Sequence, residues 1–98
     1  MERVPLTEAL ADRDRVLRAY LDDDGRLVRM PAKHRKRLVV LDHLARVFEP
    51  GQRYTETEVN NLMRAFHDDV ALLRRSLVDE AFLARADGVY WRIGGTVE

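Results

Sequence analysis

Apolar side chains recur every three or four positions in four stretches of the chain, the spacing of helices with one buried face. The first stretch runs from Thr7, a candidate N-cap, to Leu21, and it ends at the turn Asp22–Gly25. The second runs from Pro31, which suits a first helical turn, to about Phe48, and Pro50-Gly51 ends it.

The third helix is predicted to begin at a capping box formed by Thr55 and Glu58, and the fourth follows directly after His67-Asp68. So short a connection forces a sharp angle between the two helices, as in a helix-turn-helix. The inward positions of the last three helices are expected to be Leu38, Leu41, Leu44, Ala45 and Phe48; then Val59, Leu62, Met63 and Phe66; then Val70, Leu73, Leu77 and Val78.

A β-hairpin is predicted after the fourth helix, because Asp87-Gly88 separates two strand-like runs, 82–86 and 89–93, and favours a type I′ turn. The expected register places Ala86 opposite Val89, Arg85 opposite Tyr90 and Ala84 opposite Trp91. The short run Leu27–Met30 is expected to add a third strand, since a hairpin alone is marginally stable. Gly94–Glu98 is expected to be a frayed tail.

These elements predict a single α+β domain over residues 1–98, with about four helices and a small antiparallel sheet. Helix, turn, helix and hairpin in this order are typical of a winged-helix-like fold, in which the hairpin is the wing. That fold class makes nucleic-acid binding the first function to weigh.

Composition narrows the class of protein. The charged fraction of 35% beside 46% hydrophobic residues is typical of a globular domain, and zero cysteines exclude disulfides and thiolate metal sites. No apolar run is long enough to span a bilayer, and the N-terminus lacks the apolar core of a signal peptide. We therefore expect a cytoplasmic protein with no membrane partner.

The net charge of zero conceals a strong segregation of charge. Residues 26–46 contain seven Lys/Arg and one acid, a net of +6, whereas residues 54–80 contain six acids and three Arg, a net of −3. Such segregation creates a local field, which indicates a charged partner.

The basic run Lys33-His34-Arg35-Lys36-Arg37 is the strongest functional candidate, because cations in the first turns of a helix oppose the helix dipole. A helix that exposes cations beside free N–H groups suits phosphate or a partner's carboxylates. The alternative is a solvated face whose cations pair with Asp22–Asp24 or with the acids of later helices.

Arg74 and Arg75 occupy the position that would face DNA in a helix-turn-helix, and their planar forks suit phosphates and guanine edges. Four acids surround them on that helix: Asp68, Asp69, Asp79 and Glu80. Carboxylates repel phosphates, so we expect at least one of the two arginines to pair inside the fold and major-groove reading to be disfavoured.

The wing carries Arg85, Arg92, Tyr90 and Trp91, which can contact phosphates or stack on bases. For Trp91, packing in the core or at its edge is favoured over stacking, because large aromatic side chains dominate small cores.

Catalysis finds little support in the sequence. The three histidines, His34, His43 and His67, lack the spacing of a metal-ligand set, and capping by Asp68 accounts better for His67-Asp68-Asp69. No Gly-rich phosphate loop and no G-x-S-x-G elbow occurs. We expect neither an enzyme nor a bound cofactor or metal.

Several short motifs in fixed order resemble the DUF2087 family over about residues 21–92. They are Asp24-Gly25-Arg26-Leu27, Met30-Pro31-Ala32-Lys33, Arg37-Leu38, Phe48-Glu49-Pro50-Gly51, Tyr54-Thr55-Glu56, Glu58-Val59-Asn60, Asp69 and Leu73-Arg74-Arg75, then Leu77-Val78-Asp79, Arg85 and Tyr90. The resemblance implies a small bacterial domain of the kind attached to helix-turn-helix regulators. It implies no catalytic or ligand site.

Two functions follow as hypotheses. In the first, the chain binds double-stranded DNA in transcriptional regulation, with phosphates neutralised by Arg29, Lys33, Arg35, Lys36 and Arg37 and by the wing residues Arg85 and Arg92, while Arg74 and Arg75 anchor or read. In the second, it is a protein-interaction module that pairs as a homodimer or engages the transcription machinery without touching DNA. Zero net charge and the acidic fourth helix support the second hypothesis.

Overall fold

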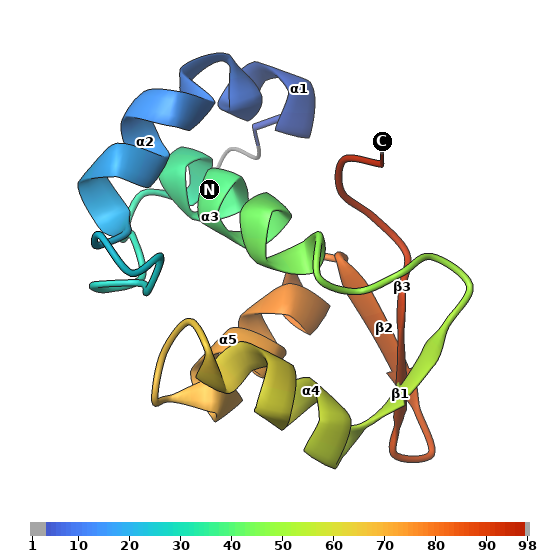
Figure 1. Cartoon of the computed structure of the whole chain (residues 1–98). Helices are drawn as coiled ribbons and strands as arrows, with labels where there is room; N and C mark the ends of the chain where they lie inside the picture. The colour runs from blue at the N-terminus through green and yellow to red at the C-terminus, as the bar shows by residue number, and fades with distance from the viewer. Residues whose placement is uncertain (1–3, 98) are drawn as a thin grey trace.

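The computed structural model describes residues 4–97 and confirms the α+β class, with helices beside one small sheet (Figure 1). The elements in chain order are α1 (Leu6–Ala9), the 3₁₀ turn η1 (Leu10–Asp12), α2 (Arg13–Tyr20), α3 (His34–Ala45), β1 (Arg53–Thr55), α4 (Glu56–Arg64), α5 (Val70–Asp79), β2 (Leu83–Ala86) and β3 (Val89–Arg92).

The three strands form one antiparallel sheet in the order β1-β3-β2. Strands β2 and β3 are the predicted hairpin, and its register is confirmed at all three expected pairs. Asp87 and Gly88 have φ values of 52° and 76°, as a type I′ turn requires. The local turn signal therefore sets the alternation of side chains along both strands.

The third strand is β1, and the prediction of a strand at Leu27–Met30 is wrong. β1 pairs with β3 so that Tyr54 lies opposite Tyr90. Leu27 forms an isolated bridge with Leu21, and its N–H donates to the Phe66 carbonyl at 2.7 Å. Because that backbone is satisfied by the end of α2 and the α4–α5 turn, it is not available to the sheet.

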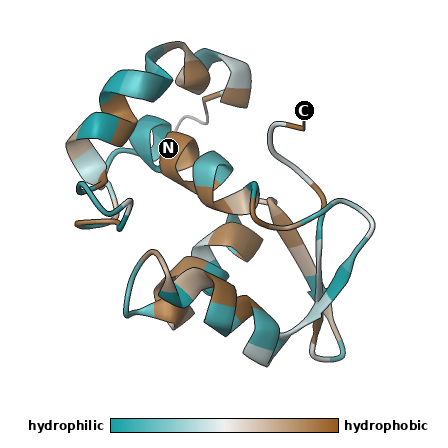
Figure 2. Cartoon of the chain, in the orientation of Figure 1, coloured by the Kyte–Doolittle hydropathy of each residue, from teal (hydrophilic) through white to brown (hydrophobic). Residues whose placement is uncertain are grey.

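The N-terminal helix is interrupted by a 3₁₀ turn, where one helix over Thr7–Leu21 was predicted. α1 begins at Leu6 after an extended Pro5, so Thr7 lies inside the first turn and is not the N-cap. Both α1 and α2 pack on α3, and η1 lets the chain bend around that helix. In Figure 2, α2 is largely hydrophilic, with hydrophobic residues recurring at helical spacing. We call residues 6–20 the N-terminal arm.

Helix α3 is the central helix of the fold. It begins at His34, later than the predicted Pro31, and the Lys33 N-cap makes no side-chain capping bond. Residues 38–42 are all buried, so the helix is enclosed on all sides. The arm covers one side of α3, and α5 packs on it as well.

The capping box that opens α4 is confirmed. The Thr55 hydroxyl accepts from the Glu58 N–H at 3.1 Å, and the Glu58 carboxylate accepts from the Thr55 N–H at 2.9 Å. At α5 the cap is Asp69, which accepts from the Leu72 N–H at 3.1 Å, and not Asp68 as predicted. The shift of one residue leaves Asp68 free to pair with Arg26 at 2.9 Å.

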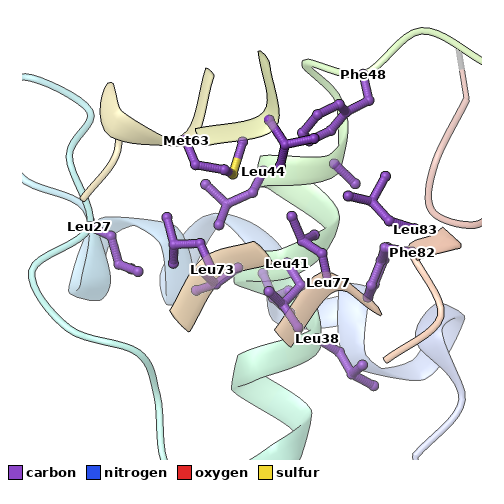
Figure 3. Close-up of a cluster of buried hydrophobic side chains, with 14 of the residues drawn as sticks. Leu27, Leu38, Leu41, Leu44, Phe48, Met63, Leu73, Leu77, Phe82 and Leu83 are labelled. Carbon is purple, nitrogen blue, oxygen red and sulfur yellow. The ribbon is translucent and has the colours of Figure 1, made fainter. Parts of the chain in front are cut away.

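The core forms where α3, α4, α5 and the hairpin meet, and Figure 3 shows its side chains converging from these elements. The fully buried residues include most of the predicted inward positions of α3, α4 and α5: Leu41, Leu44, Ala45, Phe48, Val59, Met63, Leu73 and Leu77. Leu62, Phe66, Val70 and Val78 pack against this core from its edge. The hairpin contributes Tyr90, which is 1% exposed.

The segment after β3 is held in place, so the prediction of a frayed tail is wrong for residues 94–97; Glu98 lies outside the described residues. Thr96 donates from its N–H and its hydroxyl to the Asp42 carboxylate at 2.7 and 3.0 Å. Asp42 is 1% exposed in the middle of α3. A buried carboxylate needs such donors, and the chain end supplies them.

Candidate functional site

Most of the predicted binding residues fall into two groups that different elements carry. The basic run lies at the start of α3 beside the N-terminal arm, whereas Arg74, Arg75 and Arg85 lie near the hairpin (Figure 1). The end of α5 connects the two groups, because Glu80 bonds to His34 and Arg37, and its neighbour Asp79 lines a hollow together with Arg74, Arg75 and Arg85.

At the start of α3, two side chains of the basic run are bonded to the end of α5. His34 meets the Glu80 carboxylate at 2.9 Å, and Arg37 meets the same carboxylate at 3.7 Å, with Glu80 only 11% exposed. Arg37 also donates to the Ala32 carbonyl at 3.3 Å. These contacts join α3 to the end of α5 and give two members of the basic run a structural role.

Arg35 is bonded to the N-terminal arm through Glu8, at 3.2 Å to the carboxylate and 3.1 Å to the backbone carbonyl. Within residues 4–97, Lys33 and Lys36 have no ion pair; Lys33 is exposed and Lys36 is half-buried. Arg29 is exposed, with its guanidinium 5.3 Å from the centre of the Tyr20 ring.

A hollow of about 370 Å³ lies between α2 and α3, and we call it the arm hollow. Its lining residues are Ala9, Asp12, Arg15, Val16, Ala19, Tyr20, Arg35 and Lys36. It therefore joins apolar side chains of the arm to cations of α3. Arg15, which donates to Asp12 at 2.7 Å, was not among the predicted site residues. The sequence does not show that α2 packs on α3, so no sequence pattern indicated that Arg15 belongs to a site.

Arg92 holds the end of the chain and is not available to a ligand. Its guanidinium donates to the carbonyls of Gly94 at 2.9 Å, Phe48 at 3.2 Å and Thr96. Strand alternation explains this role, since Arg92 shares the inner face of β3 with buried Tyr90.

Arg74 belongs to a polar network beneath the hairpin. It donates to the Asn60 side chain and lies 3.6 Å from the Glu56 carboxylate, which also accepts from the Tyr90 hydroxyl at 3.0 Å. Burial raises the pKa of Tyr90 above its ordinary value, the bond to Glu56 adds to the rise, and Arg85 and Arg74 oppose it. One arginine of α5 is thus paired inside the fold, as expected, but its carboxylate partner is Glu56 of α4 and none of the four acids that surround it on α5.

A smaller hollow of about 140 Å³ lies between α5 and the hairpin, and we call it the hairpin hollow. It is lined by Arg74, Arg75, Val78, Asp79, Arg85 and Tyr90. Arg75 is exposed and has no ion pair or hydrogen bond within the described residues. Arg85 is exposed too, and its guanidinium lies 5.8 Å from the centre of the Tyr90 ring.

The open face of the sheet carries a contact that the sequence did not predict. Arg53 lies opposite Trp91 across β1 and β3, with its guanidinium 4.9 Å from the centre of the indole ring. Trp91 is partly buried there, and Tyr90, one position along, is the residue of β3 whose aromatic side chain lies in the core. Identifying Arg53–Thr55 as the third strand would have revealed the pair.

Two further features are absent among residues 4–97. No group of three or more His, Asp or Glu side chains is placed to hold a metal ion. No described helix is long and apolar enough to cross a membrane.

The chain belongs to the DUF2087 family, described as an uncharacterized protein conserved in bacteria, whose model matches residues 26–92. The match includes α3, the sheet, α4 and α5, and it excludes the N-terminal arm and the segment after β3. No curated protein and no solved structure matches the chain significantly.

Proposed function

We propose that this chain is a winged-helix-like, transcription-associated domain that binds the phosphate backbone of DNA at the hairpin hollow. The observation that carries the proposal is the convergence of Arg74, Arg75 and Arg85 on one small hollow between α5 and the hairpin. Two of these three guanidinium groups have no carboxylate partner among the described residues.

Like charges placed together without partners are unfavourable for folding, so stability alone does not account for Arg75 and Arg85. An anion between them would offset that repulsion. The planar guanidinium fork matches two oxygens of a phosphate, and such charge-assisted bonds are about twice as strong as neutral ones. Phosphate is therefore the chemistry that this hollow fits.

The order of elements supports a nucleic-acid backbone as the source of the phosphate. A helix, a turn, a second helix and a hairpin follow one another, and the hollow lies between the second helix and the hairpin. Asp68 and Asp69 at the start of α5 disfavour insertion of that end into a groove. Contacts to phosphates position a protein without reading bases, and that mode suits this surface.

The cations at the start of α3, which the sequence predicts to be the main phosphate contacts, are partly paired inside the fold. Arg35 and Arg37 are bonded to Glu8 and Glu80, so their charge is largely offset inside the fold. Lys33 and Lys36 remain, and neither of them lines the hairpin hollow. The phosphate contact is therefore assigned to Arg75 and Arg85, with Arg74 held behind them.

The test is duplex binding measured at several salt concentrations between about 50 and 200 mM, by fluorescence anisotropy. Each phosphate contact contributes about 0.9 to the slope of log K against log salt, so Arg75→Ala/Arg85→Ala should reduce the slope by about 2. Arg18→Ala is the matched control, because Arg18 is an exposed arginine on α2. A wild-type chain that binds no duplex at the lowest salt, or a double variant that behaves like the control, would refute the proposal.

A further inference from the structure

The arm hollow differs from the hairpin hollow in its chemistry. Its apolar lining, which we call its floor, consists of Ala9, Val16, Ala19 and Tyr20, and its charged lining, which we call its rim, consists of Asp12, Arg15, Arg35 and Lys36. A phosphate has no group that could fill an apolar floor. The complementary ligand has apolar side chains flanked by negative charge.

The charges around this hollow favour an acidic ligand. Arg29 lies over Tyr20, and Lys33 follows at the exposed N-cap of α3, which extends the positive surface beyond the rim. Asp12 and Glu8 oppose it, but each is already bonded to an arginine, Arg15 and Arg35 respectively. The cations outnumber these acids, and Lys36 has no ion pair among residues 4–97.

Stability does not explain this placement of cations. The first turn of α3 has no acidic residue and no side-chain cap, although acids are the residues that stabilise a helix start. Lys33 and Lys36 are thus unfavourable for their own helix, and no described carboxylate compensates them. A partner that supplies carboxylates would compensate the charges of Lys33 and Lys36.

A second copy of this chain does not supply the required surface. The exposed large hydrophobic side chains within residues 4–97 are Val28, Val47, Ile93 and Val97, and none of them lies on the acidic helices α4 and α5. The acids of a second copy would therefore meet the rim and leave the apolar floor unfilled. The occupant has to carry both features on one face.

We propose that the arm hollow docks an acidic amphipathic helix from a different protein, with its apolar side chains on the floor and its carboxylates at Lys36, the lining cation that has no ion pair among residues 4–97. Helix-in-groove recognition uses anchors at helical spacing, which suits a hollow that runs between two helices. The arm lies outside the residues that match the family model, so this docking surface depends on the part of the chain beyond the common domain.

The test uses the full chain and a labelled peptide of about 15 residues in which Leu and Glu repeat at helical spacing. A peptide of the same composition with a scrambled order has no apolar face, and one with Leu replaced by Ser keeps only the charge. The first peptide should bind at least about tenfold more tightly than either control peptide. Equal binding of all three peptides would overturn the proposal.

Two variants locate the binding. Lys36→Glu reverses a rim charge, and Ala19→Trp fills the hollow from an exposed position of α2, so each should weaken peptide binding by about tenfold or more. Thermal unfolding checks that both variants are folded. If only one of them folds, that variant alone is enough to test whether the peptide binds at the arm hollow. Peptide binding that is unchanged in a folded variant would overturn the proposal.

Arg75→Glu is the control, because Arg75 lies at the hairpin hollow and its reversal should leave peptide binding unchanged. Lys36→Glu should likewise leave duplex binding unchanged, so the two proposals can fail separately. If instead a DNA duplex displaces the peptide and Lys36→Glu weakens both ligands, the hollow is a nucleic-acid site and peptide docking is refuted.

Discussion

Arg37 at the start of α3 and Arg75 on α5 each have a cationic neighbour in the sequence, Lys36 and Arg74, but their surroundings in the fold differ. The carboxylate of Glu80 lies 3.7 Å from Arg37, and a carbonyl accepts from it at 3.3 Å. Arg75 is exposed at the mouth of a hollow and has no such partner among the described residues. One arginine is held inside the fold, and the other is open to a ligand.

The difference shows that a cluster of cations in a sequence does not by itself define a binding surface. Glu8 and Glu80, which neutralise much of the α3 cluster, are 27 residues before Arg35 and 46 residues after His34. Only the fold brings them there. The cations that have no ion pair among the described residues, Arg75 and Arg85 at the hairpin hollow and Lys36 at the arm hollow, are better candidates for function.

The largest effect should come from Glu80→Ala. Removing one partner of a buried ion pair leaves uncompensated charge, so the free energy of unfolding should fall by about 3 kcal/mol. Urea unfolding measures the change. Arg75→Ala should change stability by no more than about 0.5 kcal/mol, as expected of an exposed residue. Similar losses in the two variants would contradict the difference between the bonded start of α3 and the exposed Arg75.

A sharper comparison uses the neighbours Arg74 and Arg75. Arg74→Ala should lower the free energy of unfolding by about 1–2 kcal/mol, because Asn60 and Glu56 lose a bonding partner beneath the hairpin. Arg75→Ala should weaken duplex binding without this loss. A stability loss at Arg75 equal to that at Arg74 in urea unfolding would contradict the assignment of separate roles.

The features that the sequence predicted correctly depend on residues close together in the chain. The capping box joins Thr55 and Glu58 within one turn, and Asp87-Gly88 determines its own turn type and hence the hairpin register. The wrong third strand and the docked C-terminal segment both depend on distant partners, Trp91 for Arg53 and Asp42 for Thr96. A short strand-like run carries no information about its partner.

The same limit applies to the candidate site. The sequence named Arg74, Arg75 and Arg85 as candidates and indicated that at least one arginine of α5 would pair inside the fold, but it pointed to acids of that helix, whereas Arg74 pairs with Glu56 of α4. It assigned Arg92 to the wing surface, although β3 turns that side chain inward to three carbonyls. It could not reveal the arm hollow, which exists only because η1 bends the N-terminal arm around α3.

The smallest effect concerns His43, which lies on α3 with its ring edge against Phe66 of the α4–α5 turn. Burial lowers the pKa of His43 below 6.5, Arg13 and Arg46 lower it further, and Asp42 opposes them. The folded chain therefore favours the neutral imidazole. Below pH 6.5 the unfolded chain takes up the proton first, so the free energy of unfolding should decrease as pH falls from 6.5 through the lower folded pKa.

Urea unfolding of the wild type and of His43→Gln, measured from about pH 7.5 to about pH 5, isolates this contribution as the difference between the two curves. The difference should be constant above pH 6.5 and should shrink below it, because only the wild type loses the preference for neutral His43. A constant difference over the whole range would contradict the lowered pKa. Duplex binding by His43→Gln should match the wild type throughout, since His43 is not among the residues that line the hairpin hollow.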